Sequence, residues 1–226
     1  MSQLELEIKS VREGIIEMWE LTLSQVEKAL SALINYDKDL AREIINIEKR
    51  VNATELKIDR DCEDVFAIYC PVAVDLRFFL AVLKINSNLE RIGDIAEGIA
   101  KYVLSNDQAF NTELLESTKV IEMHAESIKM IEDTLQAFQS EDTSIARSIF
   151  AKDEFLDKIN QSANELIIDY LKKHPEEINQ ALYILSMIRK LERIGDHSKN
   201  IAEEIIFYVE AKVIRHADKK SKRKKP

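Results

Sequence analysis

The hexapeptide Leu-Glu-Arg-Ile-Gly-Asp occupies residues 89–94 and occurs again, unchanged, at residues 191–196. The similarity continues downstream, where the pair Ile-Ala at 99–100 recurs at 201–202. An identical run of six residues indicates an internal repeat, and each repeat unit then forms one supersecondary structure. The 226-residue chain therefore consists of two copies of one unit of about 100 residues.

The chain contains only four glycines and three prolines, too few to separate many short strands and tight turns. Hydrophobic residues make up 46% and charged residues 32% of the sequence. This mixture is typical of long amphipathic helices. The composition therefore predicts an all-α fold.

Six stretches carry apolar residues at helical spacing, and each predicts a helix. Asp37 or Asp39 can cap the second helix, and Pro71 and Pro175 stop the second and the fifth. The six helices cover about residues 4–34, 37–70, 72–104, 113–138, 142–173 and 176–215. The most polar interruption, residues 105–112, is the expected boundary between the repeats.

These elements predict two pseudo-symmetric three-helix bundles, residues 1–106 and residues 107–216. Residues 217–226 are dense in lysine and arginine and are expected to form a disordered basic tail. Such a tail either contacts anionic lipid or nucleic acid, or only keeps the protein in solution.

The formal charge of −9 argues against general nucleic-acid binding, which needs clustered cations on a protein face. The first residues have charges every few positions and lack the apolar centre of a signal peptide. No segment supplies the uncharged run that a membrane-spanning helix needs. We expect a cytoplasmic protein that reaches a membrane only through a partner.

Each hexapeptide holds two carboxylates four residues apart, Glu90 with Asp94 and Glu192 with Asp196. On a helix these side chains share one face and repel each other. The arginine after each glutamate lies about 100° round the helix and is expected to be a poor partner. The glycine before each aspartate costs about 1 kcal/mol relative to alanine. That cost indicates close approach by a neighbouring helix or a ligand.

Two antiparallel helices joined by a turn bring together residues at equal distances from the turn. In the first half the turn lies near Pro71, so Glu48 falls opposite Asp94 and Asn52 opposite Glu90. In the second half the turn lies near Pro175. There the same reasoning puts Asp153 opposite Asp196 and Asp157 opposite Glu192. Each hairpin is expected to gather four oxygen-bearing side chains on one patch.

Clustered carboxylates without matching cations predict a metal site, and oxygen ligands suit magnesium, calcium, manganese or iron. The alternative is a solvated acidic face balanced by lysines and arginines of neighbouring helices. Catalytic patterns are missing from the sequence: no Glu-x-x-His pair, no glycine-rich phosphate loop and no nucleophile elbow. The sequence therefore does not predict an enzyme.

The chain resembles the PhoU family in both halves. The resemblance rests on Pro-Val-Ala-Val-Asp-Leu-Arg at 71–77, the hexapeptide at 89–94 and the segment 191–204. It implies two three-helix bundles with multinuclear metal sites on Glu/Asp-x-x-x-Asp motifs. The residues that it implies as metal ligands are Glu48, Asn52, Glu90, Asp94, Asp153, Asp157, Glu192, Asp196 and Asn200.

Two positions depart from the repeat. Asn52 stands where the second half has Asp157, and Gly98 stands where it has Asn200. The first-half site therefore has fewer charged or polar ligands, and we expect it to bind metal more weakly than the second, or not at all.

The resemblance also implies a function. PhoU-like proteins link the Pst phosphate transporter, through its ATPase, to a PhoR-type sensor histidine kinase and repress the phosphate-starvation response. The implied cofactors are iron, manganese, zinc or magnesium ions, and the implied assembly is a homodimer. An alternative function for such a carboxylate bundle is storing or buffering metal ions. Elemental analysis and metal exchange would distinguish the two.

Overall fold

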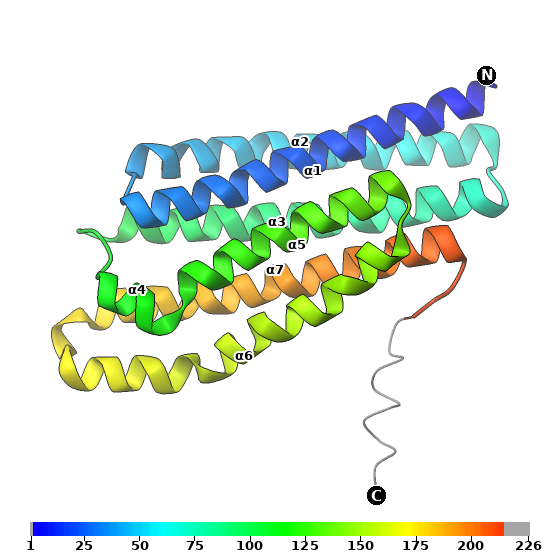
Figure 1. The fold of residues 1–226 in the computed structure, drawn as a ribbon. Helices are drawn as coiled ribbons and strands as arrows, with labels where there is room; N and C mark the ends of the chain where they lie inside the picture. Colours follow the sequence, from blue (N-terminus) through cyan, green and yellow to red (C-terminus); the bar gives the residue numbers. More distant parts are fainter. Residues whose placement is uncertain (1, 215–226) are drawn as a thin grey trace, which may run out of the picture.

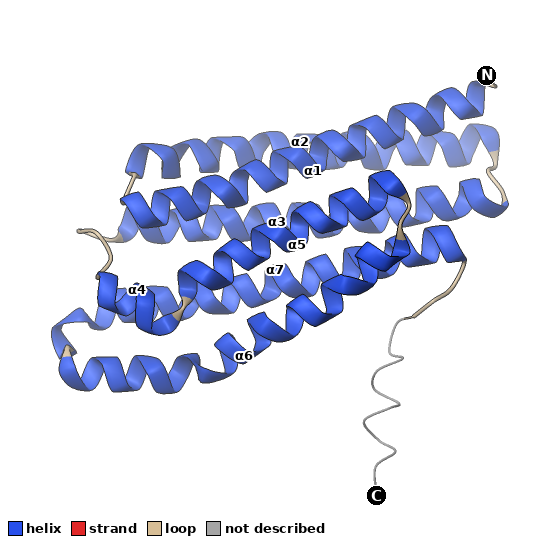
Figure 2. Cartoon of the chain, in the orientation of Figure 1, coloured by secondary structure: helices blue, strands red, loops and turns tan. Residues whose placement is uncertain are grey.

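The computed structural model describes residues 2–214 and is built from helices, with no strand among these residues (Figures 1 and 2). The α-helices are α1 (Gln3–Asn35), α2 (Lys38–Tyr69), α3 (Ala73–Ser105), α4 (Thr112–Thr118), α5 (Val120–Ser140), α6 (Thr143–Lys173) and α7 (Ile178–Glu210), and a 3-10 turn, η1 (Pro175–Glu177), precedes α7. The predicted all-α fold is confirmed.

The helix ends follow the local chemistry of the sequence. Of the two candidate caps for α2, Asp37 holds the position, and its carboxylate accepts hydrogen bonds from the backbone N–H groups of Asp39 and Leu40. Asp142 caps α6 in the same way through the N–H of Ser144. A short polar side chain here satisfies donors that have no partner within the helix.

The fourth predicted helix is wrong in one respect, because the chain breaks it into α4 and α5. Lys119 adopts a left-handed backbone conformation, with φ of 54°, between the two helices. No glycine or proline marks this break, so the apolar spacing continued across it. The last helix also ends earlier than predicted, at Glu210. The predicted tail at 217–226 lies outside the described residues.

Helices α3 and α7 run antiparallel through the middle of the molecule, with α1 and α2 on one side and α5 and α6 on the other (Figure 1). Lys84 of α3 bonds Glu204 of α7, and Asn88, one turn further along α3, bonds Asn200, one turn back along α7. Continuing this register along both helices places the two hexapeptides side by side at the centre of the pair.

The two halves share one apolar core, and α1 packs directly against α5. The indole N–H of Trp19 in α1 donates to the hydroxyl of Thr134 in α5, and its ring lies 5.2 Å from that of Phe138. The imidazole Nε2 of His124 in α5 lies 2.9 Å from the carbonyl oxygen of Val26. Such a shared core couples the halves mechanically. The predicted division at residue 106 remains a prediction about domains.

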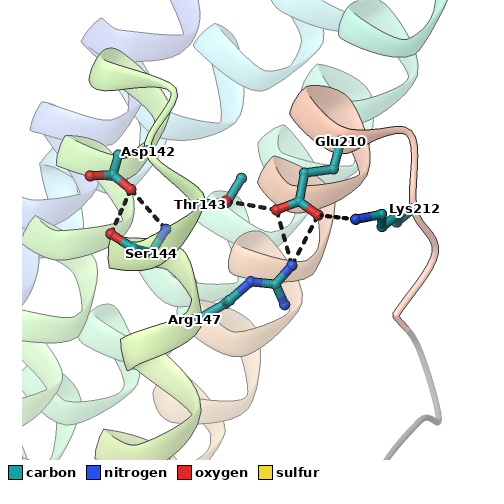
Figure 3. Close-up of polar contacts among 6 residues, drawn as sticks. All are labelled: Asp142, Thr143, Ser144, Arg147, Glu210 and Lys212. Carbon is teal, nitrogen blue, oxygen red and sulfur yellow. Dashed lines mark hydrogen bonds and ion pairs between the residues drawn. The ribbon is translucent and has the colours of Figure 1, made fainter.

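The end of α7 is fixed to the start of α6 by one carboxylate (Figure 3). Glu210 accepts hydrogen bonds from the hydroxyl of Thr143, from the guanidinium of Arg147 and from the ammonium of Lys212. The hydrogen bond from Thr143, followed by those from Lys212 and Arg147, lowers the pKa of Glu210 to about 2. The last turn of α7 is thereby held where the chain leaves the bundle.

None of the described helices combines the length and the apolar character needed to cross a membrane.

Buried His124 gives the fold a defined acid sensitivity. Burial lowers the pKa of this imidazole to about 4, although its contact with the Val26 carbonyl opposes the shift. The unfolded chain binds the proton more tightly, so this contribution to stability is full above about pH 6.5 and is lost as the pH falls toward 4. Between pH 7.5 and pH 5 the loss is roughly 2 kcal/mol.

We expect the substitution His124→Gln to remove this part of the pH dependence. Urea unfolding at pH 7.5 and pH 5 measures it, as the difference in free energy of unfolding for each protein. An equal loss of stability in wild type and variant would show that His124 is not responsible.

Candidate metal-binding clusters

The first acidic cluster is centred on Glu48 of α2, which is 5% exposed and faces α3. Its Oε2 atom accepts a hydrogen bond of 2.9 Å from the side-chain amide of Gln25 in α1. The other carboxylate oxygen, Oε1, and the amide oxygen of Gln25 are buried without a hydrogen-bond partner. Buried oxygens normally have partners. Two unsatisfied acceptors therefore make this the part of the cluster that can accept a cation.

Gly93 makes room for these two side chains. A Cβ atom at this position would lie 2.9 Å from the Gln25 amide oxygen, 2.9 Å from Glu48 Oε2 and 3.2 Å from Val51 Cγ1. The predicted close approach of a neighbouring helix is therefore confirmed. The glycine of the hexapeptide is a packing requirement of the buried carboxylate.

Burial and neighbouring acids raise the pKa of Glu48 to about 7. Loss of hydration is the largest cause, the hydrogen bond from Gln25 opposes it, and Asp94, Glu97 and Glu90 then raise it further. The pKa of Glu90 is also raised, by burial and then by Asp94. These acids are close enough to disfavour one another's charged forms, as the hairpin geometry predicted.

Arg91 corrects one expectation from the sequence. Its guanidinium lies 3.4 Å from Glu90 and 3.2 Å from Asp94, so it contacts both carboxylates of its own hexapeptide. The side chain bends back along the helix surface, which its length allows. Because Arg91 is 55% exposed, the contacts are screened by water and weakly stabilising. They do not extend to the buried carboxylate of Glu48.

The second acidic cluster is centred on Asp153 of α6, which is 4% exposed and lies against Gly195 of α7. A Cβ atom on Gly195 would lie 2.8 Å from Asp153 Oδ1 and 2.9 Å from a methyl group of Leu156. The ammonium of Lys199 donates to Asp153 Oδ2 and, at 3.0 Å, to Asp196 Oδ1. Asp153 Oδ1 is buried without a partner.

The charges of this cluster also shift the pKa values of Glu192 and Lys199. Burial raises the pKa of Glu192, as do Asp196, Asp157 and Asp153, while Lys199 lowers it. Its two hydrogen bonds to carboxylates raise the pKa of Lys199 far above its usual range, despite the opposing effect of burial. Lys199 is therefore a permanent cation inside the cluster.

The two clusters differ at positions that the sequence reasoning missed. Glu97 lies three residues after Asp94, whereas Lys199 lies three residues after Asp196. Beside Gly93 lies Gln25 of α1, 2.9 Å from where a Cβ atom would be, whereas beside Gly195 lies Met130 of α5, at 3.8 Å. Extending the comparison of the two repeats by one helical turn beyond the hexapeptides would have shown that Glu97 corresponds to Lys199. Gln25 and Met130 lie on separate helices, so only the fold shows their role.

Two of the predicted ligands lie apart from the buried carboxylates. Asn52 is exposed on α2. Asn200 donates its amide to Asn88 across the contact between α3 and α7. It therefore takes part in the contact between the halves, and its role as a metal ligand stays a prediction. The first half lacks such an amide because Gly98 accommodates Lys190 there.

The oxygen atoms of the predicted ligands are not close enough together to coordinate one metal ion. Among residues 2–214, three donor atoms of acidic, histidine or cysteine side chains lie within 4.8 Å of one another only at His174, Glu176 and Glu177, near η1. The carboxylate of Glu177 is already bonded by Asn111 and Tyr170. This group therefore stabilises the turn between α6 and α7. A metal in either acidic cluster would require its carboxylates to move together.

Comparison with known proteins places both halves in one family. The model of the PhoU domain matches residues 15–103 and, a second time, residues 120–205. The phosphate-specific transport system accessory proteins PhoU of Edwardsiella tarda and Escherichia coli K12 are each 33% identical to this chain over 214 residues. The matched region covers 95% of this chain in both cases, and 87% and 88% of those proteins.

The fold agrees with the sequence comparison. The crystal structure of PhoU from Pseudomonas aeruginosa superposes with a TM-score of 0.84 at 32% identity, covering 93% of this chain and all of that chain. The crystal structure of the phosphate transport system regulatory protein PhoU from Streptococcus pneumoniae gives 0.83 at 32% identity, with 93% and 99% covered.

The packing constraint at Gly93 can be distinguished by experiment from the general cost of a glycine within a helix. We expect Gly93→Ala to lower the free energy of unfolding, because the new methyl group displaces the buried Gln25 and Glu48 side chains. The matched control is Gly14→Ala in α1, where the new atom meets only Ile58, at an ordinary 3.7 Å. There the change should raise the free energy of unfolding by about 0.5–1 kcal/mol.

Urea unfolding of both variants measures the difference. A gain in stability from Gly93→Ala equal to that from Gly14→Ala would show that the buried pair imposes no packing constraint.

Proposed function

This chain belongs to the PhoU family, and we propose that it is a negative regulator of phosphate uptake and of the phosphate-starvation response. As a member of this family it is an accessory protein of phosphate-specific transport. The observation that carries the proposal is the match of both repeats, over nearly the whole chain, to proteins named for that role. A match of a single repeat would indicate only the fold.

The proposed mechanism is binding without catalysis. The protein would act as an adaptor between the ATPase of the Pst transporter and a PhoR-type sensor histidine kinase, in the cytoplasm and as a homodimer. An adaptor can change the activity of a partner only if it binds two states of that partner with different affinity. The two halves share one apolar core, so a change of packing in one half would be felt by the other, which is what this mechanism requires.

Metal binding is the second part of the proposal, and the first-half cluster fits a cation better. Glu48 and Gln25 offer buried oxygens without partners, and Glu90, Asp94 and Glu97 add negative charge beside them. An all-oxygen set suits manganese, magnesium or iron better than zinc. A bound ion would supply positive charge that lets these carboxylates stay ionised together. Lys101 bonds Glu97 at the surface and leaves Glu48 uncompensated.

This fit reverses the order of affinity expected from the sequence. Counting ligand types favoured the second half, which has Asp157 where the first has Asn52. Lys199 changes this expectation, because its ammonium already bonds two of the second-half carboxylates, which a metal ion would need as ligands. We therefore propose the first half as the stronger metal site, with Glu48, Glu90 and Asp94 as its main ligands.

The alternative function is storage or buffering of metal ions. The same clusters would then hold several ions that exchange readily with solution. A regulatory site instead needs few ions. The ratio of metal to protein therefore distinguishes the two functions.

The regulatory role can be tested in cells that lack this protein. Without it we expect a phosphate-starvation reporter to be active in phosphate-rich medium, and the wild-type gene to restore repression. The tagged protein should also retain the ATPase of the phosphate transporter through purification from membranes. Full repression in the absence of the protein would contradict the proposal.

The metal site can be tested by thermal melting with and without Mn²⁺. We expect Mn²⁺ to raise the melting temperature of the wild type, because a ligand at 100 times its Kd contributes about 2.7 kcal/mol. The variant with Glu90→Gln and Asp94→Asn should lose this shift while remaining folded, because both positions are partly exposed. An equal Mn²⁺ shift in both proteins would exclude the first-half site.

A further inference from the structure

We propose that the ammonium of Lys199 takes the place of a metal ion in the second half, so that this chain carries an exchangeable metal in its first half only. The second-half cluster would then be held together permanently by the protein's own cation. The comparison between halves rests on the proposed metal binding of the first half, whereas the role of Lys199 can be tested separately.

The position of the ammonium carries the argument. Lys199 lies on α7 and bonds Asp153 of α6 as well as Asp196 of its own helix. It thus joins the two helices through the carboxylates that the hairpin places opposite each other. A metal ion shared by Asp153 and Asp196 would occupy the same space between them. Both cannot be there at once.

A tethered cation competes strongly with a free one. The ammonium is a compact charge with three donors, and its stem is anchored on the helix that carries the site. Being part of the chain, it has a high effective concentration at the carboxylates. A metal ion would have to break two charge-assisted hydrogen bonds and expose the ammonium before binding. We therefore expect weak metal binding at this cluster.

The first half has the opposite charge at the matching position. Glu97 stands three residues after Asp94, so an acid occupies the position that Lys199 has in the second half. The cation nearest to Glu90 and Asp94 is Arg91, which is bonded at the surface. No hydrogen bond or ion pair from a cation to Glu48 is present among the described residues. One oxygen of each buried carboxylate, Glu48 Oε1 and Asp153 Oδ1, has no hydrogen-bond partner. The difference between the halves is that a lysine bonds the other oxygen of Asp153, whereas an amide bonds that of Glu48.

The decisive substitution is Lys199→Glu, which gives the second half the charge pattern of the first. It is made in the full-length chain that also carries Glu90→Gln and Asp94→Asn, so that the first-half site is absent. Calorimetric titration with Mn²⁺ then reports on the second half alone. We expect weak binding without the Lys199 substitution and at least a tenfold gain in affinity with it.

Two controls define the result. Lys172→Glu in the same background makes the same change of net charge at an exposed lysine that bonds only Asp169, and it should leave Mn²⁺ binding unchanged. In the otherwise wild-type chain, Glu192→Gln with Asp196→Asn should change Mn²⁺ affinity less than twofold. A large loss of affinity from this pair would overturn the inference, as would a lack of gain from Lys199→Glu.

Lys199→Gln provides a second test in case the glutamate variant folds poorly. Removing the ammonium leaves Asp153 buried without its cation, so the metal-free variant should melt at a lower temperature than the wild type. With Glu90→Gln and Asp94→Asn also present, so that the first-half site is absent, Mn²⁺ should restore the melting temperature if a metal can take the place of the ammonium. A loss of stability that Mn²⁺ does not restore would show that Lys199 is only a structural ion-pair partner.

The outcomes also separate this inference from the proposed function. If the wild type binds no Mn²⁺ but the Lys199→Glu protein does, the first-half metal proposal fails and the role of Lys199 stands. If the wild type binds through Glu90 and Asp94 but the Lys199→Glu protein gains nothing, the reverse holds.

Discussion

The antiparallel contact between α3 and α7 organises the packing of the described helices. It brings the two hexapeptides side by side at the centre of the molecule, while the remaining helices cover the outer faces (Figure 1). Because each central helix must pack on its partner and on its own hairpin neighbour, space beside it is scarce. Glycine at positions 93 and 195 creates that space, and in each half a carboxylate fills it.

A buried carboxylate must be neutralised, protonated or paired, since transfer of an isolated charge out of water is very unfavourable. The two halves solve this problem differently. Burial raises the pKa of both carboxylates. Asp153 has the ammonium of Lys199 as its partner, which opposes the rise, whereas Glu48 has only the amide of Gln25 as donor, and its pKa rises to about 7. A nearly symmetric backbone therefore carries one cluster with an internal cation and one without.

This asymmetry suits a regulatory adaptor. In the proposed mechanism the second-half cluster is held by a lysine, and only the first-half cluster would change its charge on binding a metal ion. The shared core between α1 and α5 would transmit that change, because packed cores deform little.

The amino-acid sequence was enough to predict the all-α fold, most helix ends and the facing of the carboxylates across each hairpin. These features follow from local rules: helical spacing, caps such as Asp37 and the equal distances of paired residues from a turn. The break at Lys119 was not predictable, because no glycine or proline marks it. Nor was the earlier end of the last helix, where Glu210 is fixed by side chains of α6.

The folded structure was needed to show that a lysine bonds the carboxylates of the second cluster. The number and type of possible ligands say nothing about burial. The stability of each charged side chain depends on its burial and on the side chains that contact it from other helices. Lys199 and Glu97 were visible in the sequence, but the reach of that ammonium to Asp153, and the lack of any such contact at Glu48, depend on the packing of α6 on α7 and of α2 on α3. Electrostatic interactions depend on the distances between charged groups, and these distances are fixed only when the chain has folded.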